Sequence, residues 1–357
     1  MELHKIVITG GPCGGKSSAR GYVQSYFEAQ GYTVLFVPET ATELITGGVA
    51  PWTCGKNVDH QKCQMRLQTV KEDVFAYAAS TMPKEQILMI CDRGTIDNCA
   101  YMNDEEFAET LAYLGEDAVS LRDRYDAVFH LVTAANGAEA YYTTENNAAR
   151  TETVEEAIAL DNRVIAAWTG HPHFRIIDNS TDFKGKMRRL IEEIEAYLSH
   201  FEIERKFLIK CPDIEALEAD PCCHRVELVQ TYLTSALGEE VRIRQRGEDG
   251  HFSYYKTVKI GEGVKRIEAE ERIDKRTYLS LMRDADPDRH PIYKTRYYYS
   301  YDGQSFEIDL YPSMPDEAIV EIELYREDQE VRLPASFTLI REVTGDPAYK
   351  NHTLAKL

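Results

Sequence analysis

The stretch FEIERKFLI, residues 201–209, alternates apolar and charged side chains. Successive side chains of a β-strand point to opposite faces, so Glu202, Glu204 and Lys206 share one face, with neighbours ~6.6 Å apart along the strand. The other face is apolar except for Arg205. A strand on a solvated surface shows the same alternation. The stretch therefore predicts a strand and leaves open whether its charged face is solvated or functional.

Charged alternation recurs throughout residues 200–357. This part of the chain combines period-2 segments with turn signals (GEDG, IGEG and YDGQ) and many tyrosines, a pattern typical of antiparallel β-structure. The charged alternate positions are Arg242, Arg244 and Arg246 in VRIRQRG, Lys259 in YYKTVKI, Arg266, Glu268 and Glu270 in RIEAEERI, Lys294 and Arg296 in IYKTRYYY, Glu307 and Asp309 in FEIDLY, and Glu321 and Glu323 in VEIEL.

Some of these segments are basic and others are acidic. A solvated sheet tends to intersperse the two signs, because like charges directly opposite each other are unfavourable. Segregated charges suit a site in which bases bind polyphosphate oxygens and acids bind the accompanying divalent metal. If the sheet closed into a barrel, these charges would line one lumen and would need a charged guest to offset their desolvation.

The first half of the chain predicts a different architecture. The runs KIVIT, TVLFVP, QILMIC, DAVFHLV and FRIID are continuous, apolar and rich in β-branched residues, and helical periodicity fills the segments between them. This order indicates a parallel sheet sandwiched by helices, the last helix spanning roughly residues 183–198. We therefore expect two domains, 1–199 and 200–357, with no Gly/Ser linker between them.

A phosphate-binding loop is predicted at residues 10–17, GGPCGGKS, which fit G-x-x-x-x-G-K-[ST] between a strand and a helix. Glycines let backbone N–H groups point at phosphate oxygens, and the helix N-terminus adds positive potential. Lys16 would reach the β- and γ-phosphates, and Ser17 would bind Mg²⁺. The alternative is a structural glycine-rich turn. The expected nucleotide-binding residues are Gly10, Gly11, Pro12, Cys13, Gly14, Gly15, Lys16, Ser17 and Ser18.

Further candidates lie where a parallel sheet places its chemistry, at the carboxyl ends of strands. Asp92 follows QILMIC and is the expected magnesium partner, whereas Glu39 follows TVLFVP and could orient or deprotonate an acceptor hydroxyl. Either acid could instead cap the helix after it. Arg93 and Asp97 are weaker candidates. Arg150, in a polar stretch before a helix, is either a lid arginine that closes over phosphates or an exposed side chain.

Composition limits the partners. Lys and Arg total 41 against 60 Asp and Glu, a net charge of -19, so the overall field repels nucleic acid and anionic membranes. No apolar run approaches the ~20 residues that span a bilayer. The eight cysteines show no CxxC or zinc spacing, and the N-terminus lacks the build of a signal peptide. We expect a soluble cytoplasmic protein, and the composition says nothing of its oligomeric state.

The first half resembles known P-loop proteins. The segments GGPCGGKSS, VPETATELI, CDRGTIDNCAY and AARTETVEEA are similar to P-loop ATPases and kinases related to nucleoside and ribosylnicotinamide kinases, over about residues 1–199. The resemblance implies binding of ATP and Mg²⁺. It does not identify an acceptor.

The second half resembles the CYTH superfamily, the triphosphate tunnel metalloenzymes. EIERK at 202–206 matches the ExExK signature, and the likeness continues in order through QTYLT, VRIRQRG, VKIGEGVKRIEAEERI, IYKTRYYY, FEIDLY, VEIEL and EVTGDPAYKNHTLA. It is greatest for the bacterial branch that includes inorganic triphosphatases. The resemblance implies an eight-stranded antiparallel β tunnel barrel, a triphosphate threaded through it, and Mg²⁺ or Mn²⁺ on the acidic side.

The resemblance also implies roles for individual residues. The positions expected to bind triphosphate are Lys206, Arg242, Arg244, Lys259, Arg266, Lys294 and Arg296. The acidic positions, where a metal pair and an attacking water would lie, are Glu202, Glu204, Glu268, Glu270, Asp309, Glu321 and Glu323. Catalysis is expected from Glu202, Glu204, Lys206, Lys294, Glu321 and Glu323. Arg246 and Glu307 lie at strand ends, and Glu342 and Asp346 would belong to a structural turn.

Three functions remain open from the sequence. The first is metal-dependent hydrolysis of a triphosphate, with tripolyphosphate the expected substrate and thiamine triphosphate or a nucleoside triphosphate as alternatives. The second is cyclisation of ATP, as in adenylyl cyclases of the superfamily, which needs the same triphosphate grip. The third is a polyphosphate sensor with little turnover, coupled to a P-loop domain that acts as a switch or small-molecule kinase.

Overall fold

The computed structural model describes residues 2–142, 153–199, 203–236, 238–260 and 267–356. The chain divides into two compact units, Met1–Ile191 and Glu192–Leu357. The division lies inside helix α7 (Phe183–Leu198), N-terminal to the boundary expected after Ser199. A helix that continues across the division explains why the sequence shows no flexible linker there.

The Met1–Ile191 unit is built on a five-stranded parallel sheet of order β2-β3-β1-β4-β5. Its strands are β1 (Glu2–Thr9), β2 (Thr33–Val37), β3 (Gln86–Asp92), β4 (Ala127–Leu131) and β5 (Phe174–Ile177). The five apolar runs of the sequence are therefore the five strands. The middle strands β1, β3 and β4 are almost completely buried, which is why their side chains are apolar on both faces.

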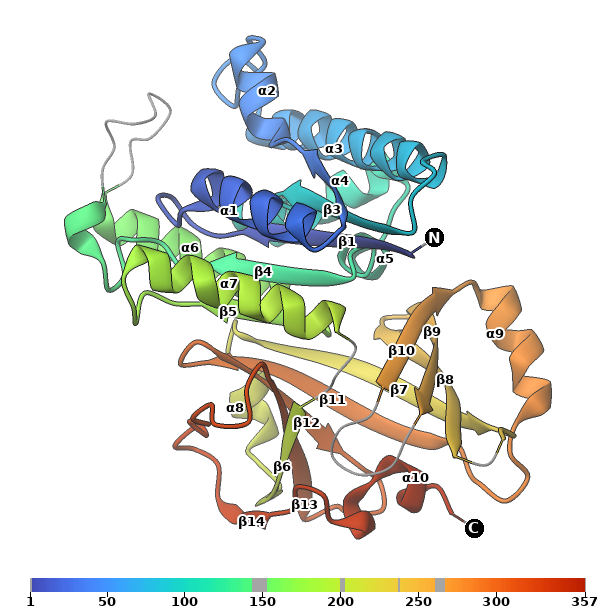
Figure 1. Cartoon of the computed structure of the whole chain (residues 1–357). Helices are drawn as coiled ribbons and strands as arrows, with labels where there is room; N and C mark the ends of the chain where they lie inside the picture. The colour runs from blue at the N-terminus through green and yellow to red at the C-terminus, as the bar shows by residue number, and fades with distance from the viewer. Residues whose placement is uncertain (1, 143–152, 200–202, 237, 261–266, 357) are drawn as a thin grey trace. The chain divides into compact units, whose positions relative to one another are not determined.

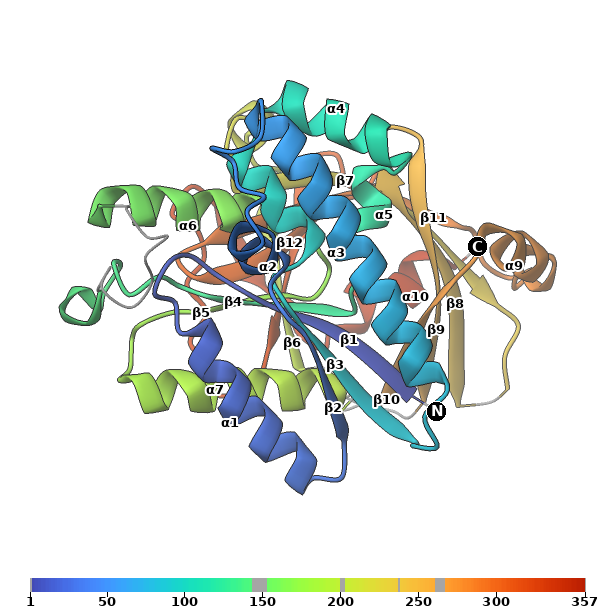
Figure 2. The same cartoon turned by 90° about the horizontal axis from the view of Figure 1, so that it is seen from above.

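Helices cover both faces of this sheet (Figures 1 and 2). The helical segments are α1 (Lys16–Ala29), α2 (Thr40–Thr46), α3 (Asn57–Ser80), η1 (Thr95–Tyr101), α4 (Asp104–Leu114), α5 (Ala118–Arg122), η2 (Glu139–Tyr141), α6 (Val154–Trp168) and α7. Capping boxes start two of them: the Asn103 side chain accepts the Glu106 N–H, and the Thr153 side chain accepts the Glu156 N–H. One core cluster joins Met65 of α3 and Trp168 of α6 to Val7 on β1.

The Glu192–Leu357 unit is built on a nine-stranded antiparallel sheet of order β10-β9-β8-β7-β11-β12-β13-β6-β14 (Figure 1). The strands are β6 (Ile203–Lys210), β7 (Cys223–Leu233), β8 (Glu239–Glu248), β9 (His251–Ile260), β10 (Ile267–Ile273), β11 (Ile292–Tyr301), β12 (Gln304–Leu310), β13 (Glu317–Leu324) and β14 (Leu339–Glu342). Short helical segments complete the unit: α8 (Ile214–Glu218), α9 (Lys275–Leu281), η3 (Met282–Asp284), η4 (Pro347–Tyr349) and α10 (Asn351–Leu354).

This sheet differs from the expected eight-stranded barrel in two ways. It has a ninth strand, β14, which pairs with β6 through a register shift between Leu339 and Arg341. All four residues of β14 are exposed. The strand therefore lacks the alternation of buried and exposed residues from which a strand is predicted. Among the described residues, no hydrogen-bonded pairing joins the edge strands β10 and β14, so closure into a tunnel is not observed.

The apolar face of strand β6 packs as its alternation predicts. Phe207 and Ile209 are buried in a core cluster with Phe306 and Val320 of the neighbouring strands. Arg205, the exception in that apolar row, donates from Nε and Nη2 to the two carboxylate oxygens of Glu342, at 2.9 and 2.8 Å. Its guanidinium also lies 5.0 Å from the centre of the Phe207 ring. The arginine is thereby accommodated at the edge of the core.

Two general features follow from the described residues. The eight cysteines all lie within them and form no disulfide bond. In the described part of the chain, the helices are too short or too polar to cross a bilayer.

Candidate active sites

One face of the nine-stranded sheet collects the charged alternate positions. Directly paired residues of an antiparallel sheet share a face, and the register pairs Arg296 with Asp309, Lys206 with Glu321 and Gln230 with Arg244. We call this side the charged face. Following the register across the sheet, its residues are Glu204, Lys206, Arg242, Arg244, Arg246, Lys259, Glu270, Lys294, Arg296, Glu307, Asp309, Glu321 and Glu323. The backbone of Glu268 pairs with Lys259 in the same row.

Much of the charged face is buried. Arg246 and Asp309 are fully buried, Arg296 is 5% exposed, and Lys294 and Glu321 are 7% and 8% exposed. Charged side chains are rarely buried unless they are paired, because burial removes their hydration. The solvated-surface interpretation of the alternation therefore does not describe these strands.

Arg296 is the centre of an ion-pair cluster. Its Nε and Nη2 atoms lie 2.6 and 2.7 Å from the two carboxylate oxygens of Asp309, a bidentate contact. Its Nη2 also lies 3.1 Å from Glu321 Oε2, and its Nη1 pairs with Glu307. One guanidinium on β11 therefore holds carboxylates from both β12 and β13.

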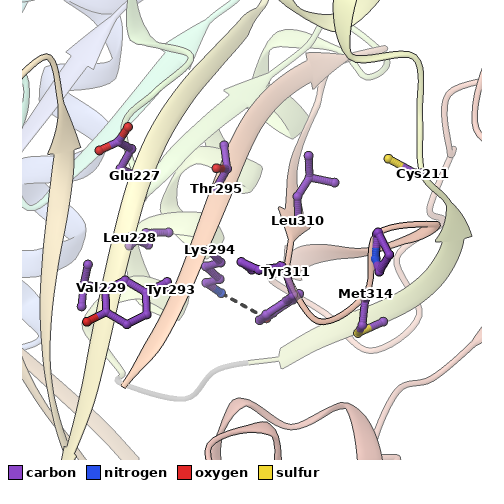
Figure 3. A pocket seen from close by; sticks show the side chains of 12 residues that line it. Cys211, Glu227, Leu228, Val229, Tyr293, Lys294, Thr295, Leu310, Tyr311 and Met314 are labelled. Carbon is purple, nitrogen blue, oxygen red and sulfur yellow. Dashed lines mark hydrogen bonds between the residues drawn. The ribbon is translucent and has the colours of Figure 1, made fainter. Parts of the chain in front are cut away.

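Two lysines complete the ion-pair cluster. Lys206 Nζ lies 2.7 Å from Glu321 and 3.2 Å from Glu204. Lys294 pairs with Asp309, and its Nζ lies 3.4 Å from the Tyr311 hydroxyl, as the dashed line in Figure 3 shows. We define the ion-pair cluster as Lys206, Lys294, Arg296, Glu307, Asp309 and Glu321.

Burial and charge shift the pKa values within the cluster in opposite directions. Burial lowers the pKa of Lys294 to about 8, and the neighbouring Arg296 charge adds to this effect. Burial raises the pKa of Glu307 to about 7, although Arg296 opposes the shift. Burial also acts to raise the pKa of Asp309 and of Glu321, but adjacent cations outweigh it and hold both below their ordinary values. Asp309 and Glu321 are therefore carboxylates at neutral pH.

A second polar group lies on the same face at β8, β9 and β10. Arg244 Nη2 lies 2.7 Å from Glu270 Oε1, and the Thr257 hydroxyl donates to Glu270 Oε2 at 2.8 Å. Arg246 donates from Nε to the Tyr298 hydroxyl at 3.2 Å. Arg246 therefore faces the interior with the other arginines of VRIRQRG, although the sequence placed it at a strand end.

Several expected site residues cannot be located. Glu202, Arg266 and Arg150 lie outside the described residues, as does the side chain of Glu268. Within the described part of the chain, no group of three or more His, Cys, Asp or Glu side chains is arranged to hold a metal ion. The carboxylates of the ion-pair cluster have the oxygen ligands that Mg²⁺ and Mn²⁺ prefer, but here they are turned toward lysine and arginine.

Two acids predicted to be structural do contact backbone or neighbouring side chains. Glu342 pairs with Arg205, as described above. The Asp346 side chain accepts the Ala348 N–H at 3.1 Å and lies 3.0 Å from Arg341.

A cavity of about 420 Å³ lies beside β7, β11 and the end of β12, and its lining comes from both faces of the sheet (Figure 3). Glu227, Val229, Tyr293 and Thr295 belong to the face opposite the charged one, whereas Leu228 and Lys294 belong to the charged face. Lys294 is shared between this cavity and the ion-pair cluster, but the arginines of the charged face do not line the cavity. We therefore do not assign triphosphate binding to it.

The predicted phosphate-binding loop connects β1 to α1 in the other unit. Gly10 has φ of +139°, and a Cβ atom there would lie 2.1 Å from the Leu131 carbonyl oxygen. A Cβ on Gly14 would lie 2.5 Å from the same oxygen. Only glycine fits at both positions, because the loop passes directly against the end of β4. Ser17 and Ser18 are exposed at the start of α1.

Lys16 folds back over this loop and donates from Nζ to the carbonyl oxygens of Gly10 and Gly11, at 2.7 and 2.9 Å. Burial lowers its pKa to about 8, and the Arg93 charge contributes. The negative charges of Glu39, Asp92 and Asp97 act to raise the pKa of Lys16. The candidates predicted after β2 and β3 therefore surround the same lysine.

Glu39 is held by Arg93 rather than acting as a helix cap. Arg93 Nε lies 2.6 Å from Glu39 Oε1, and the Thr42 hydroxyl donates to Oε2 at 2.6 Å. Burial acts against the charged form, but Arg93 prevails and lowers the pKa of Glu39 to about 2. Burial raises the pKa of Asp92, and the Glu39 charge adds to the rise. Arg93 adopts φ of +68°, a strained value for a bulky residue.

Asp97 also makes structural contacts. Its Oδ2 accepts the Gly94 N–H at 2.6 Å, and its Oδ1 accepts from Trp168 Nε1 at 3.2 Å. These contacts cap η1 and link it to α6.

Two residues near the loop are absent from the sequence predictions. Asp161 of α6 is 1% exposed, and its Oδ1 accepts the Gly11 N–H at 2.6 Å and lies 2.9 Å from His130 Nε2. Lys186 of α7 is 3% exposed and donates to the Val132 carbonyl at 2.6 Å and to Asn179 Oδ1 at 2.8 Å. Asp161 could have been found from the sequence, because it is an acid on the same face of α6 as the apolar residues Ala157, Leu160 and Val164.

Comparison with known proteins adds two independent similarities. The AAA domain family model matches residues 5–186. The inorganic triphosphatase of Acetivibrio thermocellus is 30% identical over 157 residues, which cover 43% of this chain and 93% of that protein.

Solved structures give corresponding similarities. A crystal structure described as the hypothetical protein NE1496 is 36% identical, with a TM-score of 0.31, and covers 43% of this chain and 97% of that one. A second, described as the inorganic triphosphatase NE1496, is 35% identical, with a TM-score of 0.31, and covers 43% of this chain and 93% of that one. From its sequence matches, this chain belongs to the AAA domain family through residues 5–186 and to the family of the Acetivibrio thermocellus inorganic triphosphatase.

Proposed function

We propose that the Glu192–Leu357 unit is a triphosphatase that hydrolyses inorganic triphosphate with the help of Mg²⁺ or Mn²⁺. We propose in addition that the Met1–Ile191 unit binds ATP with Mg²⁺ at the loop of residues 10–17. The observation that carries the first proposal is the charged face, where cations from three or more strands point to one buried side of a sheet.

The sequence similarity supports assigning triphosphate hydrolysis to this unit. The AAA domain match occupies residues 5–186, so the Glu192–Leu357 unit is the part of the chain outside it that can accommodate a 157-residue alignment. The aligned relative is almost fully covered, at 93% of its length.

Neutralising the substrate is the first task of the charged face. A condensed phosphate repels an incoming hydroxide, and fixed cations in a partly dry site reduce that repulsion. Lys294 and Arg296 are the buried cations nearest the acidic strands, and Arg244 and Arg246 extend the row on β8. Lys206, Arg242, Lys259 and Arg266 complete the proposed triphosphate-binding set.

The acidic residues hold the metal and the water in this proposal. A divalent metal, when bound, polarises phosphate oxygens and lowers the pKa of a water molecule. Glu202, Glu204 and Glu323 are the first ligands that we propose, and Glu268, Glu270, Asp309 and Glu321 are the further candidates. The attacking water would form a bond to the terminal phosphorus while the bond to the bridging oxygen breaks and pyrophosphate leaves, and a carboxylate of this set would accept the water's proton.

The proposed nucleotide site uses the loop amides, Lys16 and the exposed hydroxyl of Ser17. Asp92 is the proposed second magnesium partner, and Glu39 and Arg93 face the acceptor side. The Arg93–Glu39 ion pair keeps Glu39 ionised but lowers its pKa to about 2, which makes it a weak base, so we propose that Glu39 orients an acceptor hydroxyl. The acceptor itself is unidentified, so the unit is an ATPase or a kinase in this proposal.

A phosphate-release screen tests the first proposal. The full chain is incubated with tripolyphosphate, pyrophosphate, thiamine triphosphate and nucleoside triphosphates, separately with Mg²⁺ and with Mn²⁺. We expect phosphate release from tripolyphosphate above all others. Formation of cyclic AMP from ATP would favour the cyclase alternative, and tight binding of tripolyphosphate without release would favour a sensor.

A further inference from the structure

Carboxylates engage every cation of the ion-pair cluster without any ligand. Lys206, Lys294 and Arg296 face Glu307, Asp309 and Glu321, and Lys206 also lies 3.2 Å from Glu204. Each of these cations has at least one carboxylate within ion-pair distance. Three of the cations that would bind triphosphate are therefore already engaged by carboxylates that would bind metal.

Burial makes this engagement costly to break. Asp309 is fully buried and Arg296 is 5% exposed. Removing one partner from a buried ion pair leaves an uncompensated charge, which is strongly unfavourable. A polyphosphate anion that binds these three cations without a metal must either displace Asp309 from Arg296 and Lys294 or place its own negative charge beside that carboxylate.

A divalent cation would change which groups these carboxylates contact. If the carboxylates of Asp309 and Glu321 turn to a divalent cation, the released Lys206, Lys294 and Arg296 can bind phosphate oxygens, and no charge is left without a partner. The ligand that matches the cluster is an anion and a cation together.

We propose that Asp309 and Glu321 are internal competitors of triphosphate, so that binding of the anion and of the divalent cation at the charged face depend on each other. The inference rests on the proposed function and adds that triphosphate and the divalent cation bind cooperatively. It predicts that removing a carboxylate improves binding of the anion when metal is absent. A simple set of independent phosphate and metal sites predicts no such gain.

Calorimetric titration of the full chain with imidotriphosphate tests the proposal. This probe carries nitrogen in place of the bridging oxygens and resists hydrolysis, so binding is measured without turnover. In EDTA, the wild-type chain should bind it weakly. Asp309→Asn should bind it at least ~10-fold more tightly, because Arg296 and Lys294 are released from a close charge pair.

Matched variants separate this effect from a change in net charge. Glu227→Gln removes one acid from the same sheet on its opposite face, where Glu227 pairs with Arg225 at 3.2 Å. We expect its affinity for the probe in EDTA to change by less than ~2-fold, because an exposed charge is screened. Glu321→Gln should also bind the probe more tightly in EDTA, because it releases Lys206 and Arg296. If thermal melting shows that Asp309→Asn does not fold, Glu321→Gln decides the test.

Adding Mg²⁺ gives the second half of the test. The wild-type chain should bind the probe much more tightly with Mg²⁺ than in EDTA, and Asp309→Asn should show a smaller ratio between the two conditions. If Asp309→Asn and Glu321→Gln bind in EDTA no more tightly than wild type, or if Glu227→Gln shows the same gain, the proposal is wrong.

Phosphate release from tripolyphosphate by the wild-type chain is measured in parallel. Its absence, with the binding pattern intact, would overturn the hydrolytic function and leave the internal competition standing. Phosphate release without a gain in affinity in Asp309→Asn and Glu321→Gln would support the hydrolytic function and overturn the internal competition.

Discussion

Arg296 illustrates what a single planar cation does at this site. Its guanidinium makes a bidentate contact with Asp309 and further contacts with Glu307 and Glu321. An ammonium group at the same place is a point charge and cannot reproduce the fork. The geometry of the ion-pair cluster therefore depends on arginine at this position, in addition to its charge.

The first prediction follows from that geometry. We expect Arg296→Lys to lower the free energy of unfolding of its unit by ~1–3 kcal/mol, since charge-assisted hydrogen bonds to buried carboxylates are lost. Tripolyphosphate hydrolysis should fall at least ~10-fold for the same reason. Urea denaturation and a phosphate-release assay measure the two effects.

Arg205→Lys is the control for this variant. It removes the same bidentate geometry from the Arg205–Glu342 pair, whose side chains are 33% and 43% exposed. Solvent screens such pairs, so we expect a stability change below ~1 kcal/mol and unaltered hydrolysis. Equal losses in the two variants would mean that the contacts of Arg296 have no special importance.

Lys186 provides a second prediction at the residue scale, on pH dependence. Burial lowers its pKa from 10.5 to about 8 in the folded protein. Between these two values the unfolded chain binds more protons than the folded one, so stability rises as pH increases from about 8 to about 10.5. Lys186→Met should lack this rise. Over this pH range the free energy of unfolding of wild type should increase relative to that of Lys186→Met by at most ~3 kcal/mol.

Tryptophan fluorescence can follow this unit alone. The chain has two tryptophans, Trp52 and Trp168, and both lie in the Met1–Ile191 unit. Urea denaturation of the full chain at several pH values, detected by this signal, compares wild type with Lys186→Met. Parallel stability profiles for the two proteins would contradict the predicted cost of burying the lysine charge.

At the scale of elements, helix α6 is tied to the phosphate-binding loop through Asp161. The carboxylate accepts the Gly11 N–H and faces His130 on β4. A Cβ on Gly11 would lie 2.5 Å from Asp161 Oδ1, so the helix and the loop are in direct contact. The position of the loop thus depends on a helix that lies 150 residues further along the chain.

The third prediction tests this connection. Asp161→Ala leaves a buried N–H without its acceptor and should destabilise the unit by ~1–3 kcal/mol while weakening ATP binding. Asp161→Asn should retain more of both properties, because its amide oxygen can still accept the Gly11 N–H. Thermal melting and ATP titration measure the effects.

Asn162→Ala is the control on the same helix, since Asn162 is exposed. It should change both measurements little. If Asp161→Ala loses stability while its affinity for ATP stays at the wild-type value, Asp161 supports the fold but does not position the loop.

At the scale of the whole molecule, the chain carries two candidate sites in two compact units. Lys16 belongs to the first site and Glu204 to the second. The two candidate sites belong to different units of the chain, and we expect them to work separately.

The fourth prediction is a reciprocal pair of variants. Lys16→Ala should abolish ATP binding at the loop and leave tripolyphosphate hydrolysis largely unchanged. Glu204→Gln should lower tripolyphosphate hydrolysis by ~10²-fold or more, because it removes a proposed metal ligand, and leave ATP binding at the loop unchanged. Loss of both activities in either variant would show obligatory coupling between the units.

Local signals account for what the sequence alone determined. The period-2 pattern around Glu204 and Lys206 predicts a strand with a charged face, because side-chain direction depends only on position along the strand. The glycines of residues 10–17 predict a phosphate-binding loop, because glycine permits the turn between a strand and a helix; their close approach to the Leu131 carbonyl depends on tertiary packing. The five apolar runs of the first unit are also a local signal, since a strand with both faces covered has apolar residues at successive positions.

Only the tertiary structure decided which charges meet and which are buried. The pairing of Arg296 with three carboxylates depends on the register of β11, β12 and β13, and the contact of Asp161 with Gly11 depends on how a distant helix packs. The exposed strand β14 had no hydrophobic pattern to predict it. Pairing energy and desolvation depend on neighbours far apart in sequence, so alternation shows that a charge lies on a face, and only packing shows what it binds there.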